Sequence, residues 1–241
     1  MKIHQILLVV IIAGLFCCGQ RKDDSRKLTI EIPDTTESDL DIFPYLYKNR
    51  LVDELNLQRL EHGVDSFELR FNTRISVLKC GLGQMLVFKK QNEEWTCLEY
   101  QYIVQDVPFG SVQNTLDYAT GFTIDTILVY KHKPVSGWKN LFAALEKENI
   151  YNLPDQEDIS SWDSLGVTIA DGTSYSVEFI NQDRYKFYTY NTPQDFVKYF
   201  KECQNMSNII DILDKEIGVK NNIEEIIGAC DKIHNTHTKI E

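Results

Sequence analysis

The sequence is poor in positive charge. Its 241 residues contain 25 Lys and Arg against 36 Asp and Glu, and the formal net charge is −11. A protein that binds nucleic acid needs a basic surface to displace counterions, so we expect no nucleic-acid partner. The acidic balance also argues against adsorption of the folded chain onto anionic lipid, which attracts basic surfaces.

Long hydrophobic runs are scarce as well. The apolar run at residues 6–16 has 11 residues, whereas a helix that crosses a bilayer core needs about 20. It follows Lys2 and stops at two cysteines, after which the chain becomes polar from Gly19 onward. A basic start, a short apolar core and an abrupt polar switch are typical of a secretory signal peptide, which we place at residues 1–17.

The common enzyme motifs are absent from the sequence. It contains no GxSxG elbow, no HExxH, no GxxxxGKS/T loop and no GxGxxG fingerprint. We therefore predict a protein that is not an enzyme and has no cofactor or metal, and we interpret His62 and His132 as solvated side chains. The distant alternative is a hydrolase, because paired carboxylates can supply acid and base. The acidic loop that it would use contains Asp155, Glu157, Asp158 and Asp163.

The end of the apolar run carries a recognisable pattern. Leu15 stands three residues before Cys18, and the small residue Cys17 stands directly before it. This pattern resembles the lipobox of bacterial lipoproteins. The resemblance implies that Cys18 is lipidated, becomes the first residue of the mature chain and anchors it in the outer membrane. Residues 20–24 resemble the export signal of surface lipoproteins in the Bacteroides and Flavobacterium group, which implies display at the cell surface, with a periplasm-facing anchor as the alternative.

Two further stretches resemble proteins of the same bacterial group. Residues 137–193 combine a Trp-led helix, a strand with Asp-Gly and a Tyr-rich strand that ends in Pro. This order is similar to uncharacterised lipoproteins of the group, and the resemblance brings no known activity with it. Asp34-Thr35-Thr36 resembles an acceptor for O-glycans in these bacteria, which implies Thr35 as a glycosylation site.

A polar stretch separates the signal from the rest of the chain. Residues 18–38 are mixed in charge and poor in aromatic side chains, which is typical of a flexible tether. We predict one globular domain over residues 39–241, with a subdivision near residues 131–136 as the alternative.

Hydrophobic periodicity predicts the strands. Apolar and polar residues alternate in two groups of segments, which is the pattern of half-buried strands. The first group covers 67–71, 98–104 and 122–130, and the second covers 175–179 and 185–190. Residues 91–93 are predicted to form a turn before the strand that contains Trp95.

Apolar residues three and four positions apart predict the helices. Ser136 is expected to cap a helix that begins with Trp138, and Thr192-Pro193 is expected to begin a second one. A further apolar stripe follows Gly218. We therefore predict an α+β fold with antiparallel β-meanders, one inserted helix and a C-terminal helical hairpin.

The cysteines that follow the signal suggest disulfides, because an exported protein meets an oxidising compartment. Cys203 and Cys230 lie on inward-facing stripes, almost symmetrically about the turn near Gly218. They form the favoured candidate pair, and the alternative is that each is a small buried thiol. Cys80 and Cys97 form a weaker candidate pair.

Aromatic residues crowd the second group of strands. Tyr188 and Tyr190 share one face of their strand, and Tyr185 and Phe187 share the other. If one face is exposed, Tyr188 and Tyr190 form a candidate glycan platform, whereas ordinary burial in a core is the alternative. We predict a non-catalytic binding or structural protein of the cell envelope whose partner is a protein or a glycan.

Overall fold

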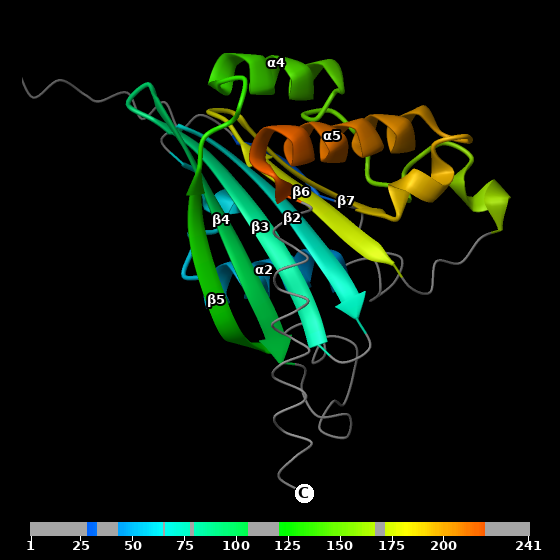
Figure 1. The fold of residues 1–241 in the computed structure, drawn as a ribbon. Coiled ribbons are helices and arrows are strands. Elements are labelled where there is room, and N and C mark those ends of the chain that lie inside the picture. The colour runs from blue at the N-terminus through cyan, green and yellow to red at the C-terminus, as the bar shows by residue number, and fades with distance from the viewer. Residues whose placement is uncertain are drawn as a thin grey trace, which may run out of the picture.

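The computed structural model describes residues 28–32, 43–64, 66–77, 80–105, 121–166 and 172–219. These residues form a seven-stranded sheet with helices on both faces (Figure 1). Helices α4 (Trp138–Lys147) and α5 (Lys201–Ile217) lie on one face, and α2 (Phe43–Glu54) lies on the opposite face. The predicted α+β class is confirmed.

The sheet joins the two groups of predicted strands. Its order is β1-β7-β6-β2-β3-β4-β5, and every pair is antiparallel except β1 with β7. Because β2 pairs with both β3 and β6, strands from before and after residues 131–136 belong to the same sheet. The strands are β1 (Thr29–Glu31), β2 (Phe67–Val77), β3 (Cys80–Gln91), β4 (Glu94–Gln105), β5 (Thr123–His132), β6 (Thr173–Ile180) and β7 (Arg184–Asn191).

The predicted turn at residues 91–93 is confirmed as the connection between β3 and β4. Gln91 pairs with Glu94, which leaves two residues in the loop. Asn92 and Glu93 both have a left-handed backbone, with φ of 49° and 65°. A two-residue loop with positive φ at both positions matches the right-handed twist of the strands it joins, and Asn tolerates this conformation well.

The helices match the predictions in part. Helix α4 begins at the predicted place, but its N-cap residue is Gly137, and the backbone N–H of Ser136 donates to Glu216 instead. The helix predicted after Thr192-Pro193 is divided into η3 (Pro193–Phe196) and α5. Phe200 has an extended backbone, with φ of −128° and ψ of 132°, and this interrupts the helix between them. The stripe after Gly218 lies outside the described residues.

Strand β1 lies within the segment predicted to be a tether. It pairs in parallel with β7, so that Ile30 lies opposite Tyr185. Arg184 donates from Nε to Glu31 Oε1 at 2.6 Å and from Nη2 to Glu31 Oε2 at 2.7 Å. The tether prediction is therefore wrong at residues 29–31, because apolar residues at 28, 30 and 32 have the alternation of a strand.

Two main apolar layers hold the fold together. Helices α4 and α5 pack on one face of the sheet over residues such as Leu69, Phe88 and Val177. On the other face, Tyr47 and Leu51 of α2 pack with residues of β3 and β4. Helix α2 was not predicted from the sequence, and its position determines the site described below.

Candidate functional site

A polar floor lies on the sheet beneath the first turns of α2. It is built from alternate residues of three adjacent strands, which therefore point to the same face. The strand register forms two rows of three residues, one with Asn72, Ser176 and Thr189 and the next with Arg74, Ser174 and Asn191. Small hydroxyl side chains occupy half of these six positions, so the floor leaves open volume under the helix.

A cavity of about 170 Å³ occupies this volume. Its roof is formed by Phe43, Pro44, Tyr47 and Lys48 of α2, and the six floor residues and Tyr175 complete the lining. The described lining residues include two cations and no carboxylate. This is notable in a chain whose net charge is −11.

Arg74 is the unpaired cation of the cavity. Its Nε atom is buried and has no hydrogen-bond partner among the described residues, and none of these gives Arg74 an ion pair. The guanidinium carbon lies 4.3 Å from the ring centroid of Tyr47. A cation over an aromatic face is attracted by the ring, so Tyr47 fixes the position of the guanidinium without using its N–H donors.

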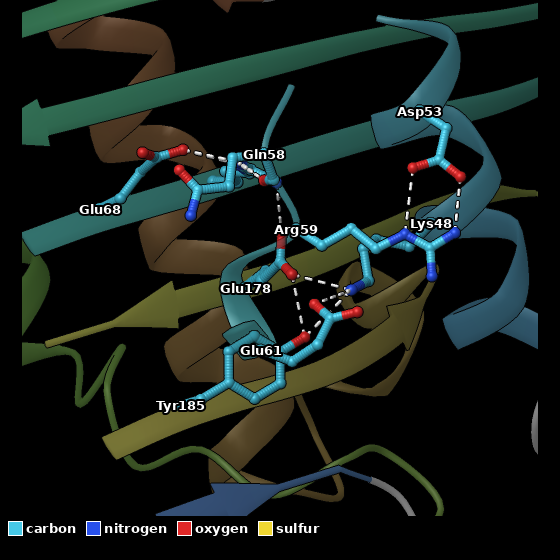
Figure 2. Close-up of polar contacts among 9 residues, drawn as sticks. Lys48, Asp53, Gln58, Arg59, Glu61, Glu68, Glu178 and Tyr185 are labelled. Carbon is cyan, nitrogen blue, oxygen red and sulfur yellow. Dashed lines mark hydrogen bonds and ion pairs between the residues drawn. The ribbon is translucent and has the colours of Figure 1, made fainter. Parts of the chain in front are cut away.

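Lys48, in contrast, is fully engaged in a buried polar network (Figure 2). Its Nζ donates to Glu178 Oε1 at 2.8 Å and to the Tyr185 hydroxyl at 3.0 Å. The Tyr185 hydroxyl in turn donates to Glu178 Oε1 at 2.9 Å. Burial and the nearby Glu178 charge raise the pKa of Tyr185, so the phenol stays protonated as a donor.

Arg70 closes the other side of the same network. It donates from Nη1 to Glu178 Oε2 at 3.2 Å, from Nε to Glu68 Oε1 at 2.8 Å and from Nη2 to the Gln58 carbonyl at 2.6 Å. Burial raises the pKa of Glu178, but Lys48 and Arg70 outweigh burial and hold this pKa below its usual value. Glu178 is therefore the charged centre of the network.

The chain after α2 is held close to this network. Arg59 forms a forked pair with Asp53, from Nε to Oδ1 at 3.0 Å and from Nη2 to Oδ2 at 2.6 Å (Figure 2). Both side chains are partly exposed, and such a pair contributes about 0–1 kcal/mol. The pair of Arg59 with Asp53 acts locally on the chain next to it. Gln58 precedes Arg59, and its carbonyl accepts a hydrogen bond from Arg70.

A second buried carboxylate lies on the opposite face of the sheet. Glu99 Oε1 accepts from Gln84 at 2.5 Å and from Gln101 at 2.6 Å, and Glu99 Oε2 lies 2.5 Å from His132 Nε2. The His132 side chain is only 20% exposed. The interpretation of His132 as a solvated residue is therefore wrong.

An open aromatic groove of about 460 Å³ forms a separate feature. Its rings contact one another, and Trp95 stacks on Phe142 with 4.1 Å between centroids. Polar side chains of four residues border these rings. The groove is lined by Phe67, Lys90, Trp95, Phe142, Tyr151, Asn152, Phe179, Asn181 and Arg184.

The prediction of an exposed glycan platform at Tyr188 and Tyr190 is wrong. Both residues have 0% exposure and belong to the core under α4 and α5. The Tyr188 hydroxyl donates to the Ile150 carbonyl at 2.6 Å. Tyr185 and Phe187 on the other face are buried too. Both faces of β7 are covered at these positions, so the alternation of its side chains leaves neither of the two aromatic pairs exposed.

The structure does not support the predicted disulfides. Cys203 is a buried free thiol within the core under α5, and Cys230 lies outside the described residues. Cys97 is also a buried free thiol and lies opposite Phe88, eight residues along β3 from Cys80. That separation is about 27 Å at about 3.4 Å per residue, so the weaker pair is excluded. Burial raises the pKa of each described thiol to about 12.

The acidic loop supports the edge of β7. Asp155 is buried and accepts from the Thr189 backbone N–H at 2.7 Å and from its hydroxyl at 2.9 Å. Burial raises the pKa of Asp155, and these hydrogen bonds oppose the shift. Glu157 donates its backbone N–H to Asp155. The side chain of Asp163 lies outside the described residues.

Other predicted residues also lie outside the described part of the chain. These are Cys18, the predicted lipidation site, and Thr35, the predicted O-glycosylation site. Among the described residues, no helix has the length and apolarity needed to span a membrane. The described side chains also contain no group of three or more His, Cys, Asp or Glu with the arrangement of a metal site.

Sequence reasoning missed the cations of the site. Lys48, Arg70 and Arg74 were not identified, because polar residues at every second position of a strand usually face water. The available signal was the opposite charge of neighbours on β2, where Glu68 precedes Arg70. Comparison of the chain with protein-family models, with curated proteins and with solved structures finds no match.

Proposed function

We propose that the chain is a lipid-anchored protein of the cell envelope that binds a small molecule, without catalysis, in the cavity under α2. The observation that supports this proposal is the buried, unpaired Nε of Arg74 at the cavity. Buried polar groups in folded proteins are nearly always hydrogen-bonded, and leaving one unpaired costs about 1–3 kcal/mol. A ligand that accepts from Arg74 removes this cost.

The composition of the cavity favours binding over turnover. A catalytic hydroxyl of Ser or Thr needs an adjacent general base. The described lining contains Ser and Thr but no His, Cys, Asp or Glu that could serve as this base. Lys48 is the remaining candidate, and its Nζ is bound to Glu178 and Tyr185. The groups that remain are suited to holding a ligand through hydrogen bonds and charge.

A screen of single-ring compounds of neutral, anionic and cationic type tests the cavity. A ligand that binds only the folded state raises the melting temperature. We expect compounds that stabilise the protein and lose this effect in Ser176→Leu, which fills the cavity floor. Circular dichroism checks that the variant is folded, and Ser174→Leu is the second blocking variant. Ligands that bind both blocked variants as well as the natural chain would exclude this cavity as the site.

The membrane anchor rests on the sequence pattern around Cys18. Only a cysteine thiol can accept the diacylglycerol, so Cys18→Ser should release the chain from membranes and Cys17→Ser should not. Partitioning of the two variants between detergent and aqueous phases measures the difference. Retention of Cys18→Ser in the detergent phase would contradict the lipoprotein proposal and leave the cavity proposal standing.

The aromatic groove favours a second candidate function, carbohydrate binding. Its rings offer apolar faces, and Asn152, Asn181 and Arg184 at its border supply hydrogen-bonding groups, a combination that is typical of ligand sites. Trp95→Ala should abolish retention on a polysaccharide column. Tyr199→Ala, which removes an aromatic residue that is 65% exposed and lies outside the groove, is the control. Equal retention of both variants would count against this function.

A further inference from the structure

We infer that the ligand of the cavity under α2 is a small hydroxylated carboxylate, one ring in size, whose carboxylate is held by Arg74. This inference rests on the proposed ligand-binding function and names the chemical class of its ligand. A uronic acid is a representative compound of this class. Three properties of the cavity support it, namely its charge, the geometry of Arg74 and the size and polarity of the floor.

The charge of the cavity favours a ligand with one negative charge. Lys48 is paired with Glu178 at 2.8 Å, so its charge is compensated inside the protein. Arg74 has no such partner among the described residues, so within this part of the chain its positive charge is uncompensated. A monoanion balances this charge, whereas a phosphate dianion leaves a partly buried negative charge unpaired, which is costly. The charge therefore favours a carboxylate over a phosphate.

The geometry of Arg74 suits a carboxylate for a second reason. A guanidinium donates two parallel hydrogen bonds to the two oxygens of a carboxylate, and Nε is one of the available donors. The Nε of Arg74 is buried and unpaired, and the nearby Tyr47 ring holds the guanidinium in place. The guanidinium is therefore held in place before binding, which reduces the conformational entropy lost on binding.

The floor of the cavity suits a ligand with hydroxyl groups. A serine hydroxyl has one donor and two acceptor positions, and Ser176 Oγ makes only a long 3.5 Å contact with Asn72 Nδ2. Ser174 and Thr189 donate to Asn191 and Asp155 and keep acceptor capacity. A cavity of about 150 Å³ holds one benzene ring, so a cavity of about 170 Å³ sets the enclosed part of the ligand at about one ring.

Calorimetric titration of the purified full chain with glucuronate and galacturonate tests the inference. Glucose is the neutral analogue, and inorganic phosphate is the alternative anion. We expect a uronate to bind at least ten times more tightly than glucose, and phosphate to compete poorly. Arg74→Gln should weaken uronate binding at least tenfold. The affinity of Arg74→Lys should lie between those of the natural chain and Arg74→Gln, because lysine keeps the positive charge but cannot donate two parallel hydrogen bonds to the carboxylate. Lys131→Gln, which removes one positive charge from an exposed position on β5, should leave the affinity unchanged.

The possible results separate this inference from the proposed function. Equal binding of glucose and uronate that survives Arg74→Gln but is lost in Ser176→Leu overturns the carboxylate and keeps the cavity as a binding site. Phosphate that binds as tightly as the uronates also overturns the choice of carboxylate. Uronate binding that is unchanged in Ser176→Leu, or the absence of binding by every probe, overturns the inference. If Arg74→Gln does not fold, the affinity of Arg74→Lys for the uronates tests the inference instead. An unchanged affinity in that variant refutes the pair of hydrogen bonds from Arg74 to the carboxylate.

Discussion

The ion pair between Lys48 and Glu178 should couple strongly in a double-mutant cycle. Each side chain is 3% exposed, and 2.8 Å separates Lys48 Nζ from Glu178 Oε1. Breaking a buried pair by removing one partner costs about 3–5 kcal/mol, because the other charge is left uncompensated. For Lys48→Met we expect about 3 kcal/mol, at the lower end, because Glu178 keeps its contact with Arg70 at 3.2 Å.

The reciprocal change should cost a similar amount. In Glu178→Gln, Lys48 keeps the Tyr185 hydroxyl at 3.0 Å, but its remaining carboxylate is the more distant Glu61, at 3.6 Å from Nζ. We therefore again expect about 3 kcal/mol. The double variant removes both charges of the pair, and Glu61 then loses the Lys48 cation at 3.6 Å. Its cost should be about 3–4 kcal/mol, well below the sum of the single changes, which gives a coupling of about 2–3 kcal/mol.

Urea unfolding followed by tryptophan fluorescence measures the four free energies of unfolding. If the slope of the unfolding free energy against urea concentration is unchanged in the variants, the compactness of the folded and unfolded states is preserved. The control cycle uses Lys90 and Glu93, an exposed pair on the β3–β4 hairpin with 2.7 Å between Nζ and Oε2. Exposed pairs contribute little, so its coupling should be below about 0.5 kcal/mol. Additive effects of Lys48→Met and Glu178→Gln would refute the reasoning.

The remaining predictions concern a close contact and a pH dependence. Gly83→Ala should destabilise the fold by about 2 kcal/mol or more, because a Cβ there would lie 2.1 Å from Tyr102 Cζ. Gly81→Ala, whose nearest contact is 3.2 Å, should cost less, and equal urea midpoints for the two variants would contradict this account. The folded-state pKa of Glu178 is lowered, so its stabilising contribution is complete above the unfolded pKa of about 4.3 and is lost as the pH falls through the folded value. The unfolding free energy should therefore decrease more steeply with acidification below about pH 4 in the natural chain than in Glu178→Gln, and parallel profiles would disprove it.

Much of the sheet could be predicted because half-buried strands alternate apolar and polar residues in the sequence. Alternation placed the strands around Phe71, Tyr100 and Ile127, and the turn after Gln91 followed from its residue types. This signal is local, and it does not depend on which element covers the sheet. It therefore identified the strands without identifying the buried polar face.

The site could not be predicted because its contacts are long-range. Lys48 and Glu178 are 130 positions apart, and β2 presents Arg70 and Arg74 at alternate positions that look like a solvent-facing surface. Only the placement of α2 turns that surface into an interior. The break before α5 could not be predicted for the same reason. Phe200 packs on Trp162 with 5.2 Å between ring centroids, and the spacing of apolar residues does not show this contact.

The pairing of β1 with β7 limits how far the domain can stand from a membrane. If the chain is anchored at Cys18 as proposed, ten peptide units join Cys18 to Leu28, where the described chain begins. Fully extended, they span at most about 36 Å, whereas the predicted tether at residues 18–38 would span about 70 Å. The sheet edge formed by β1 is thus the part of the domain closest to the lipid along the chain. With such an anchor, any partner on the same membrane must be short enough, or flexible enough, to reach a domain held within that distance.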